Sequence, residues 1–165
     1  MRSRAFLGLA ILLSLLMLRA TPVRADEPTW RAGFAKANIT PEPGLWLAGY
    51  AARDHAAAGA LQDLWVKALA LSDGEGRRAV LVTADLLGLP KAMYDAICSK
   101  LERQCGLERA DIMLNCSHTH SGPVLRHALY DIYPLDDAQR ARIDAYSAKL
   151  EGTFVETVAA SLEHL

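Results

Sequence analysis

A strand, a helix and a second strand follow one another between residues 78 and 117, and no other feature limits the possible folds so strongly. The first strand holds the unbroken apolar run Ala79-Val80-Leu81-Val82, which is typical of a strand buried on both faces. A helix is expected over residues 91–105, directly after Pro90, and a second strand over residues 111–116. A helix between two strands predicts a parallel pair joined by a right-handed crossover.

Further elements are expected on both sides of this unit. Residues 30–39 and 64–71 are predicted to be strands, with a short additional strand over residues 45–51. A last helix is expected to begin at Asp136, because Gln139 follows three residues later in the pattern of a capping box. We therefore expect an α/β fold, with a mixed sheet around a central βαβ unit, that forms part of a larger domain.

The N-terminus has the order of a Sec-type signal peptide. Two arginines precede an apolar run from Ala5 to Leu18, and Val23-Arg24-Ala25 provides a cleavage site. The apolar run has 14 residues, whereas a membrane-spanning helix needs roughly 20. We expect residues 1–25 to be removed near Ala25 on export to the periplasm or the medium, which leaves residues 26–165 as the mature chain.

The mature chain is expected to be acidic and to contain no transmembrane segment. Charged residues or proline interrupt every apolar stretch after residue 25. Without residues 1–25, the Lys and Arg count falls from 18 to 14 against 19 Asp and Glu. The resulting net charge of about −5 argues against nucleic acid or an anionic membrane as a partner. Three cysteines exclude a complete disulfide framework, and we expect all three to be buried as small apolar residues.

The strongest chemical signal is the segment from Asn115 to Pro123, in which His118 and His120 stand two residues apart. It begins where the second parallel strand ends, and functional groups of α/β proteins gather at the carboxyl ends of such strands. In extended backbone, two side chains at this spacing point to the same face about 6.5 Å apart. The imidazoles are therefore expected to converge on one metal ion or one substrate group. The same spacing also occurs in loops that bind nothing.

Asp85 closes the preceding strand. If the two strands are neighbours, its carboxylate shares an edge of the sheet with His118, where it can orient the imidazole or bind the ion itself. The alternative is that Asp85 caps the turn before Leu86. The residue pattern does not separate these two roles.

The string from His118 to Pro123 resembles the zinc motif of the neutral ceramidase family. Other parts of the chain resemble the same family in the same order, over residues 31–126. They are Ala32-Gly33 with Asn38-Ile39-Thr40-Pro41, Gly49-Tyr50-Ala51, Lys67-Ala68-Leu69-Ala70 and Val80-Leu81-Val82-Thr83-Ala84-Asp85. After Pro123 the chain departs from the family, because Val124-Leu125-Arg126 stands where glycine usually follows.

The resemblance implies a zinc-dependent amidohydrolase that cleaves an N-acyl bond, with ceramide, split into sphingosine and a fatty acid, as the family's best-known substrate. It implies that His118 is a zinc ligand and that His120 lies beside the ion, in contact with substrate or with the attacking water. Residues 26–165 would then form the N-terminal part of a catalytic domain. The family completes its zinc site with another His, a Glu and a Tyr that lie further along than Leu165, so this chain is expected to hold part of the site.

Two other functions stay open. One is a truncated or degenerate, non-catalytic exported module that keeps the fold and binds lipid or a partner. The other is a metal-dependent esterase that acts on other acylated compounds. The last predicted helix reaches Leu165 without a Gly, Asn or Pro stop signal, which indicates that the natural product continues. Catalysis is expected from the longer chain.

Overall fold

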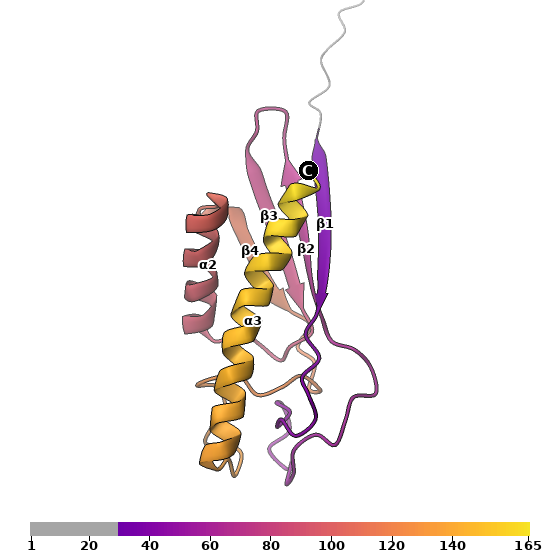
Figure 1. Ribbon diagram of the computed structural model, residues 1–165, viewed down its shortest axis with the longest axis vertical. Coiled ribbons are helices and arrows are strands. Elements are labelled where there is room, and N and C mark those ends of the chain that lie inside the picture. Colours follow the sequence, from indigo (N-terminus) through magenta and orange to yellow (C-terminus); the bar gives the residue numbers. More distant parts are fainter. Residues whose placement is uncertain (1–29) are drawn as a thin grey trace, which may run out of the picture.

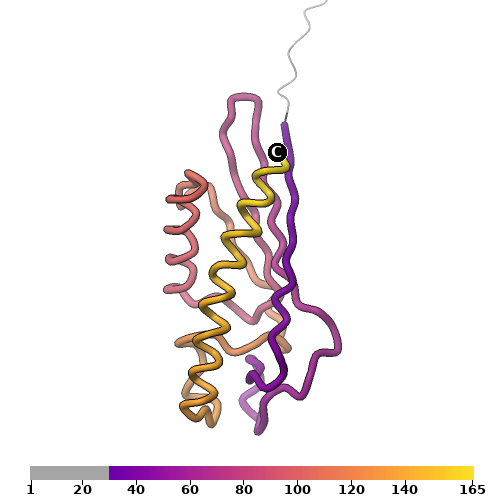
Figure 2. Tube along the Cα trace, viewed as in Figure 1, coloured from indigo at the N-terminus to yellow at the C-terminus, as the bar shows by residue number. Residues whose placement is uncertain are grey.

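The structure is a computed structural model that describes residues 30–165, in which helices pack on a single four-stranded sheet (Figure 1). In chain order the elements are β1 (Arg31–Asn38), β2 (Trp65–Ser72), β3 (Arg78–Ala84), α2 (Lys91–Cys105), the 3-10 helix η1 (Arg109–Asp111), β4 (Ile112–Cys116) and α3 (Asp137–Glu163). The tube in Figure 2 shows that the long connections gather at the end of the sheet where β3 and β4 finish.

The strands lie in the order β1-β2-β3-β4. The first three are antiparallel neighbours, whereas β3 and β4 are parallel. The crossover between the parallel strands contains α2. The predicted βαβ unit is therefore confirmed, and so is the α/β class with a mixed sheet.

Both α-helices lie on the same face of the sheet (Figure 1). Side chains alternate accordingly along β3, where Val80 and Val82 are buried beneath the helices and Leu81, on the opposite face, is 37% exposed. The expectation that this strand is buried on both faces was wrong. A continuous apolar run indicates two covered faces only when elements pack on both sides of the sheet, and within residues 30–165 they pack on one.

The main core lies between the sheet and the two helices. The spacing of four in α2 places Met93, Ile97 and Leu101 on its inner side, and each is at most 2% exposed. Burying a side chain of this size is worth about 1.5–3 kcal/mol. Gly106 ends the helix in a left-handed conformation, with a φ of 63°, as its place in the sequence predicts. The long helix α3 adds Leu150, Phe154, Val155 and Val158 to the same core.

The start of α3 forms one of the two hydrogen bonds that its sequence pattern predicts. The N–H of Gln139 donates to the carboxylate of Asp136 at 2.7 Å. The Oε1 atom of Gln139 is instead buried without a hydrogen-bond partner in the described part of the chain. The capping box is therefore half formed.

Residues 45–51 do not form the short strand expected from the sequence. One isolated bridge pairs Leu47 with Pro123, and two main-chain hydrogen bonds of 2.8 Å flank it. Both of these bonds come from the neighbours of the bridged pair: Ala48 donates to Gly122, and Val124 donates to Trp46. The bridge nevertheless ties this segment to the chain directly after the two histidines.

The predicted signal peptide lies outside the described residues, and its cleavage stays a prediction. Within residues 30–165, none of the helices has the length and apolar character needed to cross a membrane. All three cysteines are free, with Cys98 buried and both Cys105 and Cys116 half-buried. Full burial as a small apolar residue therefore holds for Cys98 alone.

Candidate functional site

His118 and His120 lie in the loop that follows β4, at the carboxyl edge of the parallel pair. The last residue of β3, Ala84, is the register partner of Cys116 at the end of β4. The two chains leave the sheet side by side, and the N–H of Ser117 still donates to the carbonyl oxygen of Ala84 at 3.0 Å. The centroids of the two imidazole rings are 5.3 Å apart, and the rings are inclined at 69°. The two imidazoles therefore lie together, as their spacing predicts.

The backbone at His118 is left-handed, with a φ of 59°, and not extended as the spacing argument assumed. A residue other than glycine is strained in this region, and such strain gathers at functional sites. The Nδ1 atom of His118 lies 2.8 Å from the main-chain carbonyl oxygen of Leu87. A carbonyl oxygen can only accept, so Nδ1 carries the proton and Nε2 of the neutral ring keeps its lone pair. Such a bond is what orients histidine ligands in metal sites.

His120 is held from the other side by the segment that contains Gly49, Tyr50 and Arg53. A β-carbon on Gly49 would lie 2.5 Å from Cγ of His120, and the φ of Gly49 is 108°, so this position requires glycine. The rings of Tyr50 and His120 meet edge-on at a centroid distance of 4.7 Å. Arg53 donates from Nη2 to the carbonyl oxygen of His120 at 2.7 Å, and its guanidinium lies 5.3 Å from the centroid of Tyr50. These contacts fix the position of the His120 ring.

Tyr133 connects this segment to a second, smaller core. Its hydroxyl oxygen accepts a hydrogen bond from the N–H of Gly49 at 2.9 Å, and its ring packs against Trp46 at a centroid distance of 5.6 Å. The smaller core consists of Leu45, Trp46, Ala48, Val124, Tyr133, Leu135 and Ile143. The loops that contain the histidines therefore pack against this smaller core.

A cavity of about 260 Å³ borders the two histidines. Its other lining residues are small, apolar or aromatic: Gly49, Ala51, Leu87, Leu129, Ile132 and Tyr133. Complete small-molecule sites are roughly 300–1,000 Å³ in volume and combine an apolar lining with a few convergent polar groups. This cavity is smaller than that range, and its lining combines apolar side chains with the two imidazoles.

Asp85 lies at the same edge of the sheet, but its carboxylate is hydrogen-bonded to the main chain at the start of β2. Its Oδ2 atom accepts a hydrogen bond from the N–H of Trp65 at 3.0 Å. The bond that orients His118 comes from Leu87 and not from this carboxylate. A role for Asp85 at a metal ion stays a prediction.

The other three histidines do not line the cavity at the pair. His55 is exposed and bonds to the neighbouring Asp54, with 2.5 Å between Nδ1 and Oδ1. The Nδ1 atom of His164 lies 3.1 Å from the carbonyl oxygen of Phe34 in β1. Figure 1 places this C-terminal end of α3 at the opposite end of the sheet from the histidine loop. His127 is exposed and lines a different cavity.

The donors gathered here are fewer than a zinc site needs. Zinc usually takes three or more protein ligands, and within residues 30–165 no group of three or more His, Cys, Asp or Glu side chains is placed to hold an ion. One observation nevertheless fits a metal: the Nε2 atom of His118 keeps its lone pair. The Nδ1 atom of His120 is buried against Gly49 without a hydrogen-bond partner in the described chain, so it does not face an ion in the cavity. A zinc site at His118 would need further donors.

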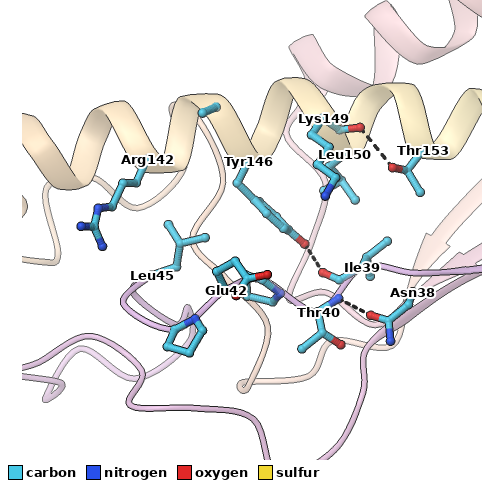
Figure 3. Close-up of a pocket in the computed structure, with 13 residues that line it drawn as sticks. Asn38, Ile39, Thr40, Glu42, Leu45, Arg142, Tyr146, Lys149, Leu150 and Thr153 are labelled. Carbon is cyan, nitrogen blue, oxygen red and sulfur yellow. Dashed lines mark hydrogen bonds between the residues drawn. The ribbon is translucent and has the colours of Figure 1, made fainter.

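A larger cavity, of about 420 Å³, lies between α3 and the segment that follows β1. In Figure 3, Arg142 and Tyr146 project from α3 toward this segment, and the Tyr146 hydroxyl donates to the carbonyl oxygen of Ile39 at 2.6 Å. Burial raises the pKa of Tyr146, so the hydroxyl remains a donor. The cavity shares no lining residue with the one at the histidines, and its greater size does not make it the site.

Three parts of the site were missed by sequence reasoning: the carbonyl group of Leu87, Arg53 and Tyr133. Their hydrogen bonds join residues that are 31, 67 and 84 positions apart in the chain. No local pattern indicates contacts at such separations. The sequence feature that could have indicated this part of the site is Gly49-Tyr50, which belongs to the family resemblance but was given no role.

Comparison with known proteins gives one consistent family. The family model described as "Neutral/alkaline non-lysosomal ceramidase, N-terminal" matches residues 30–161. A curated relative, the neutral ceramidase of Pseudomonas aeruginosa, is 32% identical over 130 residues. The matched part is 74% of this chain and 19% of that relative.

Two solved structures have the same fold. One is the neutral ceramidase from Pseudomonas aeruginosa, with a TM-score of 0.67 and 24% identity, and the other is described as "Ceramidase complexed with C2", with a TM-score of 0.66 and 24% identity. Each match covers 84% of this chain and 22% of the solved chain. This chain therefore spans about a fifth of the length of the relatives it matches.

Proposed function

The chain belongs to the neutral/alkaline non-lysosomal ceramidase family, whose N-terminal part it matches, and on this basis we propose that it forms part of the active site of a zinc-dependent amidohydrolase. The proposed reaction is hydrolysis of the N-acyl bond of a ceramide-like lipid to a fatty acid and a long-chain amine. The observation that carries the proposal is the convergence of His118 and His120 at the carboxyl edge of the parallel strands, inside the region that the family model matches.

His118 is the proposed zinc ligand, through Nε2. Its Nδ1–H is used in the bond to Leu87, so the orientation and the tautomer of the ring are set in advance of metal binding. When bound, zinc would polarise the amide carbonyl and lower the pKa of the attacking water. The remaining ligands are proposed to come from the part of the family fold that this chain does not span.

His120 is proposed to act on the substrate and the water. Amide hydrolysis adds hydroxide to the acyl carbon, breaks the C–N bond and places a proton on the leaving nitrogen. An imidazole held within hydrogen-bond reach can take the proton from water and transfer it to that nitrogen. The contacts from Gly49, Tyr50 and Arg53 support this role, because they keep the ring at the border of the cavity.

Two alternatives remain. Because residues 30–165 lack a group of three metal donors, the chain can instead be an exported module that binds lipid or a partner without catalysis. A metal-dependent esterase would use the same histidines and differ in the bond that it cleaves. In each case we propose that the chain acts outside the cytoplasm after removal of residues 1–25.

The test is a hybrid protein in which residues 30–161 replace the matching segment of the Pseudomonas aeruginosa neutral ceramidase. We expect this hybrid to hydrolyse an N-acylsphingosine analogue and to cleave the matching O-acyl ester more slowly. His120→Ala should lower kcat by at least about 100-fold, in the range expected for loss of an acid–base group. His55→Ala, which removes an exposed histidine outside the cavity, is the matched control and should leave kcat unchanged.

A folded, monomeric hybrid with no turnover on either compound would overturn the enzyme proposal and favour the non-catalytic module. Faster cleavage of the ester than of the amide would assign the esterase. Equal activity in the hybrid and in its His120→Ala variant would remove His120 from the reaction and leave the family activity to other residues.

A further inference from the structure

The face of the sheet that is turned away from the helices carries an apolar row across all four strands. The row consists of register partners on adjacent strands, in the order Phe34, Leu69, Leu81 and Met113. Their exposed fractions are 54%, 37%, 37% and 60%, respectively. Adjacent strands are about 4.8 Å apart, so the row is about 14 Å long. We call the outward-facing positions of the four strands the open face.

The rows beside it extend the apolar surface on one side and introduce positive charge on the other. One neighbouring row holds Ala32, Leu71 and Ala79, and the other holds Lys36, Lys67, Thr83 and Asn115. The ammonium group of Lys36 lies 4.5 Å from the centroid of the Trp65 ring. Within residues 30–165 neither lysine forms an ion pair with a carboxylate.

An exposed apolar row of this kind is unusual on a protein that functions alone. A sheet normally buries its apolar face against another layer, and large contiguous apolar patches on a surface mark interaction sites. Here the inner face already has α2 and α3, so the open face is the second apolar surface of the same sheet. A second layer packed on this face would bury the row.

We propose that the open face is an interface for the part of the ceramidase fold that this chain does not span. The relatives are about five times as long as the matched segment, so they contain ample polypeptide to form a further layer. The occupant is a protein surface with apolar side chains opposite the row and carboxylates opposite Lys36 and Lys67. This inference rests on family membership and on the sheet register, and it does not depend on the proposed hydrolysis.

A second copy of the chain is a poorer occupant. The outward positions of the four strands contain no Asp or Glu. A symmetric dimer through this face would therefore bury two apolar rows but leave the lysines of both copies without carboxylate partners. The charge pattern favours a different polypeptide.

The experiment compares Met113→Glu and Leu81→Glu in two settings: the chain alone and the hybrid with the Pseudomonas aeruginosa neutral ceramidase. In the chain alone the new carboxylates face water, so the melting temperature should change by less than about 2 °C. In the hybrid they would be buried beneath the adjoining layer, and we expect a fall of more than about 5 °C or the loss of soluble protein. Leu61→Glu, at an exposed leucine between β1 and β2, is the matched control and should have little effect in both settings.

Small and equal shifts in both settings would overturn the proposal, because the open face would then be exposed in the complete fold. A dimer of the chain alone that Met113→Glu dissociates would also overturn it, since the occupant would be a second copy. Binding of the chain alone to phosphatidylcholine vesicles, lost in Met113→Glu, would overturn it in favour of a lipid surface.

If the hybrid itself does not fold, the same variants are measured by co-expression with the remaining Pseudomonas aeruginosa polypeptide as a separate chain. A one-to-one complex that Met113→Glu weakens at least tenfold supports the proposal, and no complex overturns it. Neither readout involves turnover. A hybrid whose melting temperature falls in the Met113→Glu and Leu81→Glu variants, but which hydrolyses nothing, would overturn the proposed function and still support the interface.

Discussion

The ring of His120 packs directly on the α-carbon of Gly49, where a β-carbon would lie 2.5 Å from Cγ of the imidazole. Because the φ of Gly49 is also 108°, Gly49→Ala introduces both a steric overlap and backbone strain. We expect it to lower the free energy of unfolding by about 1–3 kcal/mol, measured by urea denaturation. Gly59→Ala is the control, since a β-carbon there meets no atom within 4 Å. Equal stability of the two variants would show that the ring does not occupy this position in solution.

Arg53 holds the main chain of His120 through a hydrogen bond of 2.7 Å. Arg53→Lys keeps the charge but loses the planar donor group that also stacks on Tyr50. We expect a loss of about 1–2 kcal/mol in stability, together with displaced imidazole resonances of His120 in NMR spectra. Arg103→Lys on the exposed side of α2 should change neither quantity. Unshifted His120 resonances in Arg53→Lys would contradict a positioning role for the guanidinium.

The elements of the fold could be predicted from the sequence because each depends on local patterns. The spacing of Met93, Ile97 and Leu101 identified α2, and Asp136 marked the start of α3. Two predictions failed where neighbours decide the outcome. The run around Leu81 was read as buried on both faces, although which faces are covered depends on elements outside the strand. The segment around Leu47 forms an isolated bridge with Pro123 in place of a strand, which no short-range pattern reveals.

The candidate site was predicted in part. The positions of His118 and His120 followed from the order of strand and loop, whereas the left-handed backbone at His118 did not. The orienting carbonyl of Leu87 was invisible to sequence reasoning, since every residue carries a carbonyl group and only the fold selects one. Asp85 was proposed for the same task, but its carboxylate is bonded to Trp65.

Glu151 in α3 joins two cations that come from different elements. Its side chain is 8% exposed and lies 2.9 Å from Nζ of Lys100 and 2.5 Å from Nη2 of Arg126. Glu151→Gln leaves both cations without a carboxylate, so we expect a loss of about 2–3 kcal/mol in stability. Glu75→Gln removes an exposed pairing with Arg77 and should cost less than about 0.5 kcal/mol. Similar losses in the two variants, measured by urea denaturation, would contradict a special role for the buried pairing.

Burial raises the pKa of the thiols of Cys98 and Cys105 above the ordinary value of 9.0. The folded protein therefore holds these protons to higher pH than the unfolded chain does. Unfolding releases protons in alkaline solution, so stability is retained below pH 9 and falls as the pH rises through the folded pKa values. We expect a Cys98→Ala, Cys105→Ala double variant to lose less stability between pH 8 and pH 10 than the parent. A parallel decline in both proteins would assign the effect to other groups.

Slow thiol chemistry is the second consequence of these pKa shifts. Only the thiolate reacts with iodoacetamide, so alkylation of Cys98 and Cys105 in the folded protein at pH 7.5 should be slower than in urea. Mass spectrometry of the alkylated peptides separates the two sites. Rates equal to those of the unfolded chain would contradict their burial.

The central claim divides the work between two histidines: His118 holds the metal and His120 acts on water and substrate. The most direct test measures zinc content and turnover together in the Pseudomonas aeruginosa hybrid and in its His118→Ala and His120→Ala variants. The account predicts about one zinc per chain in the parent, loss of both zinc and turnover in His118→Ala, and loss of turnover with zinc retained in His120→Ala. A His118→Ala hybrid that keeps stoichiometric zinc and normal turnover would contradict the account.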